Sequence, residues 1–251
     1  MVAQTGINNP LSRFDNPVLA AAMLTLWITA LIVWSGEPQW DLSIANAWFD
    51  QLACATSAAR DRFCAGFPAA QNPALMFIRK TLHPAPTWIG IGLLLWIIAD
   101  WRTGYRLDFA PMRARIALVA TLIVWPLLMV NGVLKAHWGR PRPWQVDEFG
   151  GWLPFVEAGT ITGHCASNCS FVSGEAAGGG WLALLFLLAP LRHRFVAALI
   201  FVPLGAFMAA LRVAFGAHFA SDAMLGFLGS IATFAIIATI LEMRAPRGAK
   251  A

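Results

Sequence analysis

Residues 195–241 read FVAALIFVPLGAFMAAL-RVAFGAHFASD-AMLGFLGSIATFAIIATIL, which is one short polar stretch between two long apolar runs. Each run, Phe195–Leu211 and Ala223–Leu241, approaches the ~20 residues that cross the hydrocarbon core of a bilayer as a helix. Both runs are uniformly apolar, whereas the strands of a membrane barrel alternate between apolar and polar residues. The stretch therefore predicts two membrane-spanning helices joined by a polar segment.

The composition of the whole chain supports this interpretation. Of the 251 residues, 58% are hydrophobic and 12% are charged, whereas a soluble domain carries about 25% charged residues. A soluble core of this size could not bury so much apolar surface. Four more apolar runs follow the same pattern: Val18–Ser35, Pro86–Trp101, Ile116–Leu134 and Gly174–Leu191. We therefore expect one all-α membrane domain over residues 1–251, a polytopic bundle of about six transmembrane helices.

Basic residues in the short loops indicate the orientation of the bundle. Six spans place both ends of the chain on one side of the membrane. Arg102–Arg115 and Arg192–Arg194 are dense in arginine, which is typical of cytoplasmic loops. We therefore expect cytoplasmic termini and an extracytoplasmic loop at 36–84. The net charge is +5, but the sequence has no Lys/Arg-rich tract or aromatic platform of the kind that nucleic-acid binders use. No nucleic-acid partner is therefore expected.

All four cysteines fall on the predicted outer side. Cys54 and Cys64 form one closely spaced pair, and Cys165 and Cys169 form another. Close pairs in an oxidising compartment suggest disulfides, although four unpaired small residues remain an alternative. A four-cysteine metal site is disfavoured because the two pairs lie on distant loops.

The polar stretch between the last two spans contains groups suited to phosphate chemistry. His218 and Asp222 are four residues apart, so on a helix they would share a face and could form a hydrogen bond. A carboxylate that holds one imidazole nitrogen fixes the tautomer and leaves the other nitrogen as a nucleophile. Arg212 could bind a phosphate through two parallel hydrogen bonds. The plainer alternative is a His–Asp pair that only caps a helix at the membrane surface.

Two further polar patches lie at the ends of predicted spans. Residues 135–143 read KAHWGRPRP, and this rigid cationic segment suits a phosphate site, although snorkelling cations at an interface are an alternative. At the start of the fourth span, Ser173 and Gly174 offer a hydroxyl and backbone N–H groups to an anion. Glu175 is either a capping carboxylate or a general acid.

Together the three patches resemble, in order, the three-part signature of the type 2 phosphatidic acid phosphatase superfamily. The matching residues are Lys135 with Arg142-Pro143, then Val172-Ser173-Gly174-Glu175, then Arg212, His218 and Asp222. The chain departs from the family pattern at Leu211, where the family has serine, and at Glu175, where it has histidine. The resemblance covers about residues 116–241, which is the expected catalytic core.

The resemblance implies a mechanism with named roles. His218 would attack phosphorus and form a phosphohistidine, and Asp222 would orient its ring. The phosphoryl oxygens would be bound by Lys135, Arg142, Ser173, Gly174 and Arg212. The family's second-motif histidine acts as general acid, so Glu175 is expected to take that role if burial keeps it protonated. His164 or His137 could replace it, and a weakened enzyme is another alternative. No metal or other cofactor is expected.

The resemblance also implies a class of substrate and a location. We expect hydrolysis of a lipid phosphate or pyrophosphate at the outer, periplasmic face of a bacterial inner membrane. Candidates are lipid A phosphate, undecaprenyl pyrophosphate, phosphatidylglycerol phosphate and phosphatidic acid. A transporter or a non-catalytic phosphate-binding membrane protein is the rival hypothesis. The oligomeric state is left open.

Overall fold

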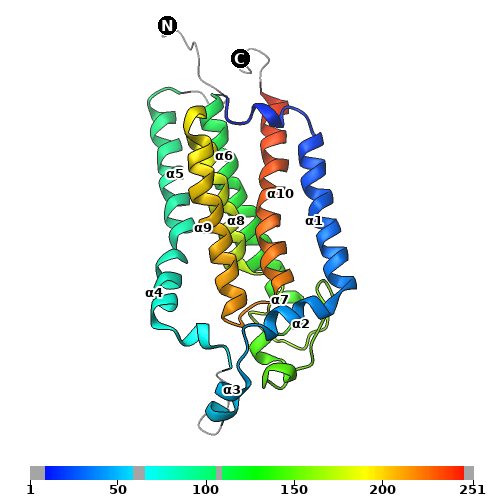
Figure 1. Ribbon diagram of the computed structural model, residues 1–251. Coiled ribbons are helices and arrows are strands. Elements are labelled where there is room, and N and C mark those ends of the chain that lie inside the picture. The colour runs from blue at the N-terminus through cyan, green and yellow to red at the C-terminus, as the bar shows by residue number, and fades with distance from the viewer. Residues whose placement is uncertain (1–8, 59–65, 106–108, 246–251) are drawn as a thin grey trace.

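A computed structural model describes residues 9–58, 66–105 and 109–245. Within those ranges every regular element is a helix, and the only β-type pairing is one isolated bridge between Val146 and Leu153. Long helices run side by side, and the start of α1 lies at the same end of the bundle as the end of α10 (Figure 1). The predicted all-α membrane bundle is confirmed.

The helices are α1 (Val18–Gly36), α2 (Pro38–Asn46), α3 (Gln51–Ala58), α4 (Pro73–Leu82), α5 (Ala85–Arg102), α6 (Ala110–Leu122), α7 (Lys135–His137), α8 (Gly174–Ala183), α9 (Arg194–Ala214) and α10 (Ala220–Arg244). A π-helix, Ile123–Leu134, joins α6 to α7. Six short 3-10 turns complete the described elements: η1 (Ser12–Phe14), η2 (Pro68–Gln71), η4 (Pro143–Gln145), η5 (Asp147–Phe149), η6 (Leu184–Leu188) and η7 (Leu191–His193).

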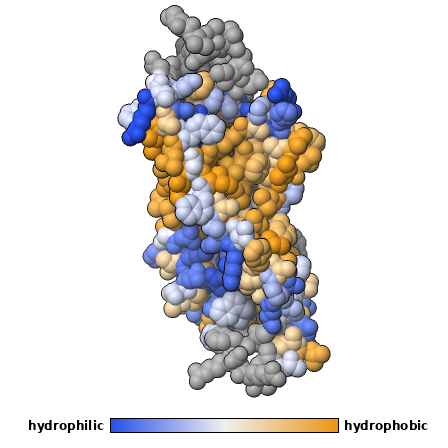
Figure 2. Space-filling model, turned by 90° about the vertical axis from the view of Figure 1, so that its left-hand side faces the viewer, coloured by the Kyte–Doolittle hydropathy of each residue, from blue (hydrophilic) through white to orange (hydrophobic). Residues whose placement is uncertain are grey.

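Within the described residues, five helical stretches are long and apolar enough to cross a membrane: Val18–Gly36, Pro73–Arg102, Ala110–His137, Leu191–Ala214 and Ala220–Arg244. On the face shown in Figure 2, an apolar band crosses the middle of the molecule, with hydrophilic surface directly below it. The remaining predicted span, Gly174–Leu191, is shorter than expected and its apolar helix ends at Leu188. Pro190 follows an extended Ala189, so the chain turns before a full span is completed.

The short α8 is the centre of the bundle and packs tightly between α9 and α10. A Cβ atom on Gly179 would lie 2.4 Å from the carbonyl oxygen of Gly205, and one on Gly180 would lie 2.3 Å from that of Phe227. Only glycine permits backbones to approach so closely. Protein rather than lipid surrounds α8. The polar first turn of this helix, with Glu175, is therefore enclosed by the neighbouring helices.

The described residues of the predicted extracytoplasmic loop 36–84 are largely helical. This segment contains α2, α3 and α4, and α4 continues into α5 with a break at His83 and Pro84. Asn72 caps α4 by accepting hydrogen bonds from two backbone N–H groups, which stabilises the first turn. Because α4 packs against α9, its side chains lie next to those of α9.

The third span begins at Ala110, earlier than expected, and widens into a π-helix around Pro126. Proline lacks an N–H group and its ring clashes with the carbonyl group four residues earlier, which accounts for the irregular turn. The side chain of Asn131 donates to the carbonyl oxygen of Pro126 at 2.8 Å. The span ends at His137, so Lys135 lies at its last turn.

Candidate active site

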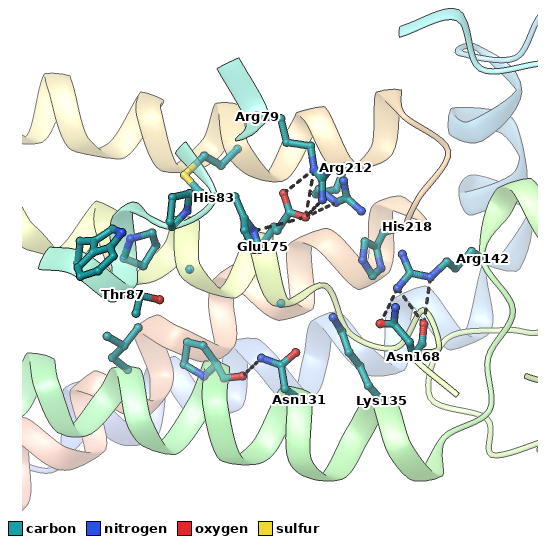
Figure 3. A pocket seen from close by; sticks show the side chains of 18 residues that line it. Arg79, His83, Thr87, Asn131, Lys135, Arg142, Asn168, Glu175, Arg212 and His218 are labelled. Atoms are coloured by element: carbon teal, nitrogen blue, oxygen red, sulfur yellow. Dashed lines mark hydrogen bonds and ion pairs between the residues drawn. The ribbon is translucent and has the colours of Figure 1, made fainter. Parts of the chain in front are cut away.

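The three predicted motifs meet around one cavity of about 650 Å³, at the end of the bundle near α7. Five predicted residues line it: Lys135 from α7, Arg142 from the following loop, Gly174 and Glu175 from α8, and Arg212 from α9. His218 also faces it (Figure 3). The order of the motifs in the sequence therefore becomes a cluster in space.

His218 lies in the turn between α9 and α10 and is only 2% exposed. Its Nδ1 atom is 2.8 Å from the carbonyl oxygen of Ser170. A carbonyl can only accept, so Nδ1 carries the hydrogen and Nε2 retains its lone pair. Burial, together with the charges of Arg142, Arg212 and Lys135, lowers the pKa of His218 well below its usual range. The ring is therefore neutral and suited to act as a nucleophile.

Asp222 does not hold His218 in the way the sequence predicted. Gly216 adopts a left-handed φ of 61° in the turn before His218, and Asp222 falls in the first turn of α10. The expectation that both side chains share one helix face is wrong, because the helix begins only at Ala220. The hydroxyl of Ser170 lies between the two, donating to Asp222 Oδ2 at 2.5 Å and lying 3.4 Å from His218 Nδ1.

Arg140 neutralises Asp222 in a fully buried network. Its guanidinium donates to Asp222 Oδ1 at 2.7 Å, to Asp41 Oδ2 at 2.8 Å and to the hydroxyl of Ser221 at 2.8 Å. The cation also lies over the ring of Phe219, 4.6 Å from the centroid. The charge of Arg140 is therefore paired inside the protein, although this residue belongs to the same cationic segment as Arg142.

Arg142, in contrast, lines the cavity and has its positive charge there. Nε and Nη2 donate to the carbonyl oxygen of Asn168 at 3.1 and 2.8 Å, and Nη1 donates to that of Ala217 at 3.2 Å. Neutral carbonyls fix the guanidinium without cancelling its charge. Arg212 is buried, and its Nε atom lies 3.4 Å from Glu175 Oε1 but lacks the geometry of a hydrogen bond. Both cations can therefore attract an anion into the cavity.

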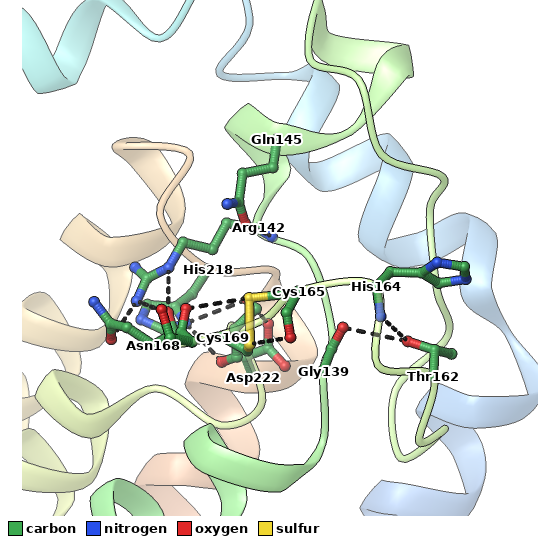
Figure 4. Close-up of a disulfide and its surroundings, with 12 residues drawn as sticks. Gly139, Arg142, Gln145, Thr162, His164, Cys165, Asn168, Cys169, His218 and Asp222 are labelled. Atoms are coloured by element: carbon green, nitrogen blue, oxygen red, sulfur yellow. Dashed lines mark hydrogen bonds between the residues drawn. A yellow bond between two sulfur atoms is a disulfide. The ribbon is translucent and has the colours of Figure 1, made fainter.

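The predicted disulfide between Cys165 and Cys169 is present (Figure 4). It closes a short loop that includes Asn168, whose carbonyl binds Arg142. The next residue after the loop, Ser170, binds His218. The crosslink therefore constrains the anchors of a cation and of the histidine. The other predicted pair, Cys54 with Cys64, involves a residue outside the described part of the chain.

Ser173 and Gly174 have separate places at the start of α8. The Ser173 hydroxyl is buried and accepts a hydrogen bond from the backbone N–H of Ala176 at 3.3 Å, so it caps the helix and does not line the cavity. Gly174 does line it. A Cβ atom at Gly174 would lie 3.1 Å from Asn131 Oδ1 and 3.2 Å from Lys135 Nζ, so a larger residue there would push both side chains away from α8.

Glu175 forms the shortest ion pair among the described residues that line the cavity, with Arg79. Nη2 of Arg79 lies 2.6 Å from Oε1, and Nε of Arg79 lies 3.0 Å from Oε2. Nδ1 of His83 is 3.7 Å from Oε1 (Figure 3). The carboxylate is 12% exposed, and such a bidentate pair stabilises the ionised form of a buried acid.

The other two histidines considered as general acids do not line the cavity. His137 is exposed, and its Nδ1 atom bonds to the carbonyl oxygen of Val133 at 2.9 Å. His164 is exposed on the loop near the disulfide (Figure 4).

Several lining residues were missed by the sequence analysis: Arg79, His83, Asn131 and Asn168. Arg79 and His83 are four residues apart on α4 and its C-terminal cap, so they point the same way. A cation and a histidine on one face, directly before an apolar span, were the signal available in the sequence. Asn131 and Asn168 gave none.

Comparison with known proteins agrees with the motifs. The family model of the PAP2 superfamily matches residues 113–246. A "Lipid A 4'-phosphatase" of Rhizobium leguminosarum is 39% identical over 86% of this chain and 94% of its own length. Proteins with the same name from Rhizobium etli and Francisella tularensis subsp. novicida are 36% and 38% identical, over 93% and 87% of this chain and 92% of each relative. No solved structure matches. The resemblance drawn from the three motifs is thereby confirmed, and the chain belongs to the PAP2 superfamily.

Proposed function

We propose that this chain is a lipid phosphate phosphatase that removes a phosphate monoester from lipid A or a closely similar phosphoglycolipid. The observation that carries the proposal is the position of His218, whose Nδ1 is held by the Ser170 carbonyl while the ring faces a cavity lined by cations. Three relatives named lipid A 4'-phosphatases, each aligned over most of this chain, support lipid A as the preferred substrate.

The reaction follows from the charges around the cavity. Nε2 of His218 attacks phosphorus, the bond to the lipid oxygen breaks, and a phosphohistidine forms. Lys135, Arg142 and Arg212 stabilise the charge on the phosphoryl oxygens, with the first N–H groups of α8 beside them. Water then attacks phosphorus, inorganic phosphate leaves and the imidazole is restored. Side-chain cations provide the positive charge, so the proposed reaction requires no metal.

The lining of the cavity fits an amphipathic substrate. Beyond the cations, the wall becomes apolar at Pro84, Pro86, Trp88, Leu122 and Met208. A phosphorylated sugar could occupy the charged part while the apolar part of the lipid follows this wall towards the membrane. The dense basic loops at the opposite end of the bundle favour a site on the periplasmic side of the inner membrane.

The test is phosphate release by the purified full chain in detergent. Lipid A, undecaprenyl pyrophosphate, phosphatidylglycerol phosphate and phosphatidic acid should be compared with and without a metal chelator. We expect the fastest release from lipid A, no effect of the chelator, and no turnover by His218→Ala. His193→Gln is a matched control, because this histidine is exposed on η7, remote from the cavity lining. Equal rates for the wild type and His218→Ala would refute the nucleophile.

The intermediate can be tested separately. Brief reaction with radiolabelled substrate followed by alkaline quenching should leave label on the wild-type chain, since phosphohistidine is stable in alkali and labile in acid. His218→Ala should take up no label. A label that survives acid but is lost in alkali would indicate a different nucleophile.

A further inference from the structure

We propose that His83, held by Glu175, is the proton donor to the leaving oxygen of the lipid, a role that the motif pattern had assigned to Glu175 itself. The inference rests on the proposed phosphatase function and names the acid that this function requires. Its basis is that the Glu175 carboxylate already faces two arginines and the His83 imidazole on one wall of the cavity.

The surroundings of Glu175 suit an acceptor better than a donor. Arg79 reaches both carboxylate oxygens at 2.6–3.2 Å, and Arg212 Nε lies 3.4 Å from Oε1. A proton on either oxygen would place an O–H among N–H donors and remove the charge that the two cations face. The carboxylate is therefore positioned to orient neighbouring groups rather than to release a proton.

His83 has the position that a proton donor needs. It caps the C-terminal end of α4, lines the same cavity as His218 and keeps 61% of its side chain exposed. Its Nδ1 atom faces Glu175 Oε1 at 3.7 Å, so closing by less than 1 Å would form a charged hydrogen bond. The carboxylate attracts a protonated imidazole, and Nε2–H is left for the substrate.

The view into the cavity places the two histidines on different sides of Glu175 and Arg212, with His218 towards Arg142 and His83 towards Thr87 (Figure 3). A phosphate among the cations would thus have the nucleophile on one side and the donor on the other. In-line displacement requires this opposition of attacking and leaving groups.

The proton balance of the step is complete. As His218 Nε2 bonds to phosphorus, the phosphorus–oxygen bond to the lipid breaks and its electron pair remains on the lipid oxygen. Nε2–H of His83 protonates that oxygen, and the lipid leaves as an alcohol. Neutral His83 then takes a proton from the attacking water, hydroxide bonds to phosphorus, and the phosphorus–nitrogen bond breaks. His83 is again protonated and phosphate is released.

The test compares two leaving groups. Dodecyl phosphate releases an alkoxide that needs a proton, whereas 4-nitrophenyl phosphate releases an anion that is stable without one. General acids contribute roughly 10²–10⁴-fold, so we expect His83→Gln to slow dodecyl phosphate hydrolysis at least ~100-fold. Release of nitrophenol should slow less than ~10-fold. His193→Gln should change neither rate, and added imidazole should partly restore dodecyl phosphate turnover in His83→Gly.

Three results would overturn the assignment. Equal losses on the two substrates would make His83 a structural residue, and unchanged rates would make it irrelevant. A leaving-group-dependent loss in Glu175→Gln but not in His83→Gln would return the acid role to Glu175. A wild-type enzyme inactive on both substrates and on lipid A would instead refute the proposed phosphatase function, and this inference with it. Retained competition by inorganic vanadate would show that the His83 variants are folded.

Discussion

Replacing Asp222 by asparagine should reduce stability more than it reduces catalysis. The carboxylate accepts hydrogen bonds from Arg140 Nη1, the Ser170 hydroxyl and the Phe219 backbone N–H, and it is fully buried. An asparagine presents one acceptor oxygen and one donor amide, so at least one of these donors would face an N–H group. The substitution also leaves the buried cation Arg140 with a single carboxylate partner, Asp41.

The two magnitudes can be separated. Breaking a buried ion pair by removing one charge costs about 3–5 kcal/mol. Catalysis should suffer less, because Nδ1 of His218 remains bonded to the Ser170 carbonyl at 2.8 Å. We expect a fall in kcat of about 10–100-fold, equivalent to about 1.4–2.7 kcal/mol of transition-state stabilisation.

The assay is thermal unfolding in detergent together with phosphate release per folded molecule. His218→Asn is the paired variant, since it removes the proposed nucleophile and leaves the Arg140–Asp222 pair intact. It should be inactive, with an unfolding temperature closer to that of the wild type than that of Asp222→Asn. If Asp222→Asn were as inactive as His218→Asn yet fully stable, the reasoning would be refuted. Asp222 would then act on His218 directly, and not through the Ser170 hydroxyl that lies between them.

Further predictions concern pH, packing and redox state. The lowered pKa of His218 means that its ring becomes protonated, and activity is lost, only as the pH falls below the range of an ordinary imidazole. Arg142→Gln should move this acid limb to higher pH, as a rate–pH profile would reveal, and an unmoved limb would show that His218 is not the titrating group. Gly174→Ala should raise KM about tenfold, because a Cβ atom there would lie 3.2 Å from Lys135 Nζ and displace this ammonium group. The unfolding temperature should change little. An unchanged KM would show that the phosphate binds elsewhere. Reduction of the disulfide should lower kcat, measured before and after dithiothreitol, and serine at both positions should lower it equally; full activity in both would exclude a role in anchoring the site.

Apolar runs were sufficient to predict the bundle because a lipid environment accepts few structures other than apolar helices. The same rule fails for α8, whose neighbours are protein. There, helix length is set by packing against α9 and α10, and the run to Leu191 overstated it. The helical content of 36–84 was missed because α2, α3 and α4 lack the uniform apolar pattern that marks a span.

The motif spacing predicted that Lys135, Arg142, Arg212 and His218 lie around one cavity, as they do, but it could not predict which groups each side chain contacts. Arg140 and Arg142 are two residues apart and chemically identical, yet one is fully buried against Asp41 and Asp222 and the other faces the cavity. Only the direction of the backbone decides between them. Ser170 was likewise invisible, since its carbonyl acts on His218 and any residue type has a carbonyl.

The bond between Cys165 and Cys169 has a consequence for the biosynthesis of the protein. Thiols remain reduced in the bacterial cytosol and are oxidised after crossing the inner membrane. If this loop lies on the proposed periplasmic side, a newly made chain would keep the loop that anchors Arg142 and His218 without its crosslink until the loop had been exported. With the site on the proposed periplasmic side, the chain would become fully competent for hydrolysis only after that loop had crossed the membrane.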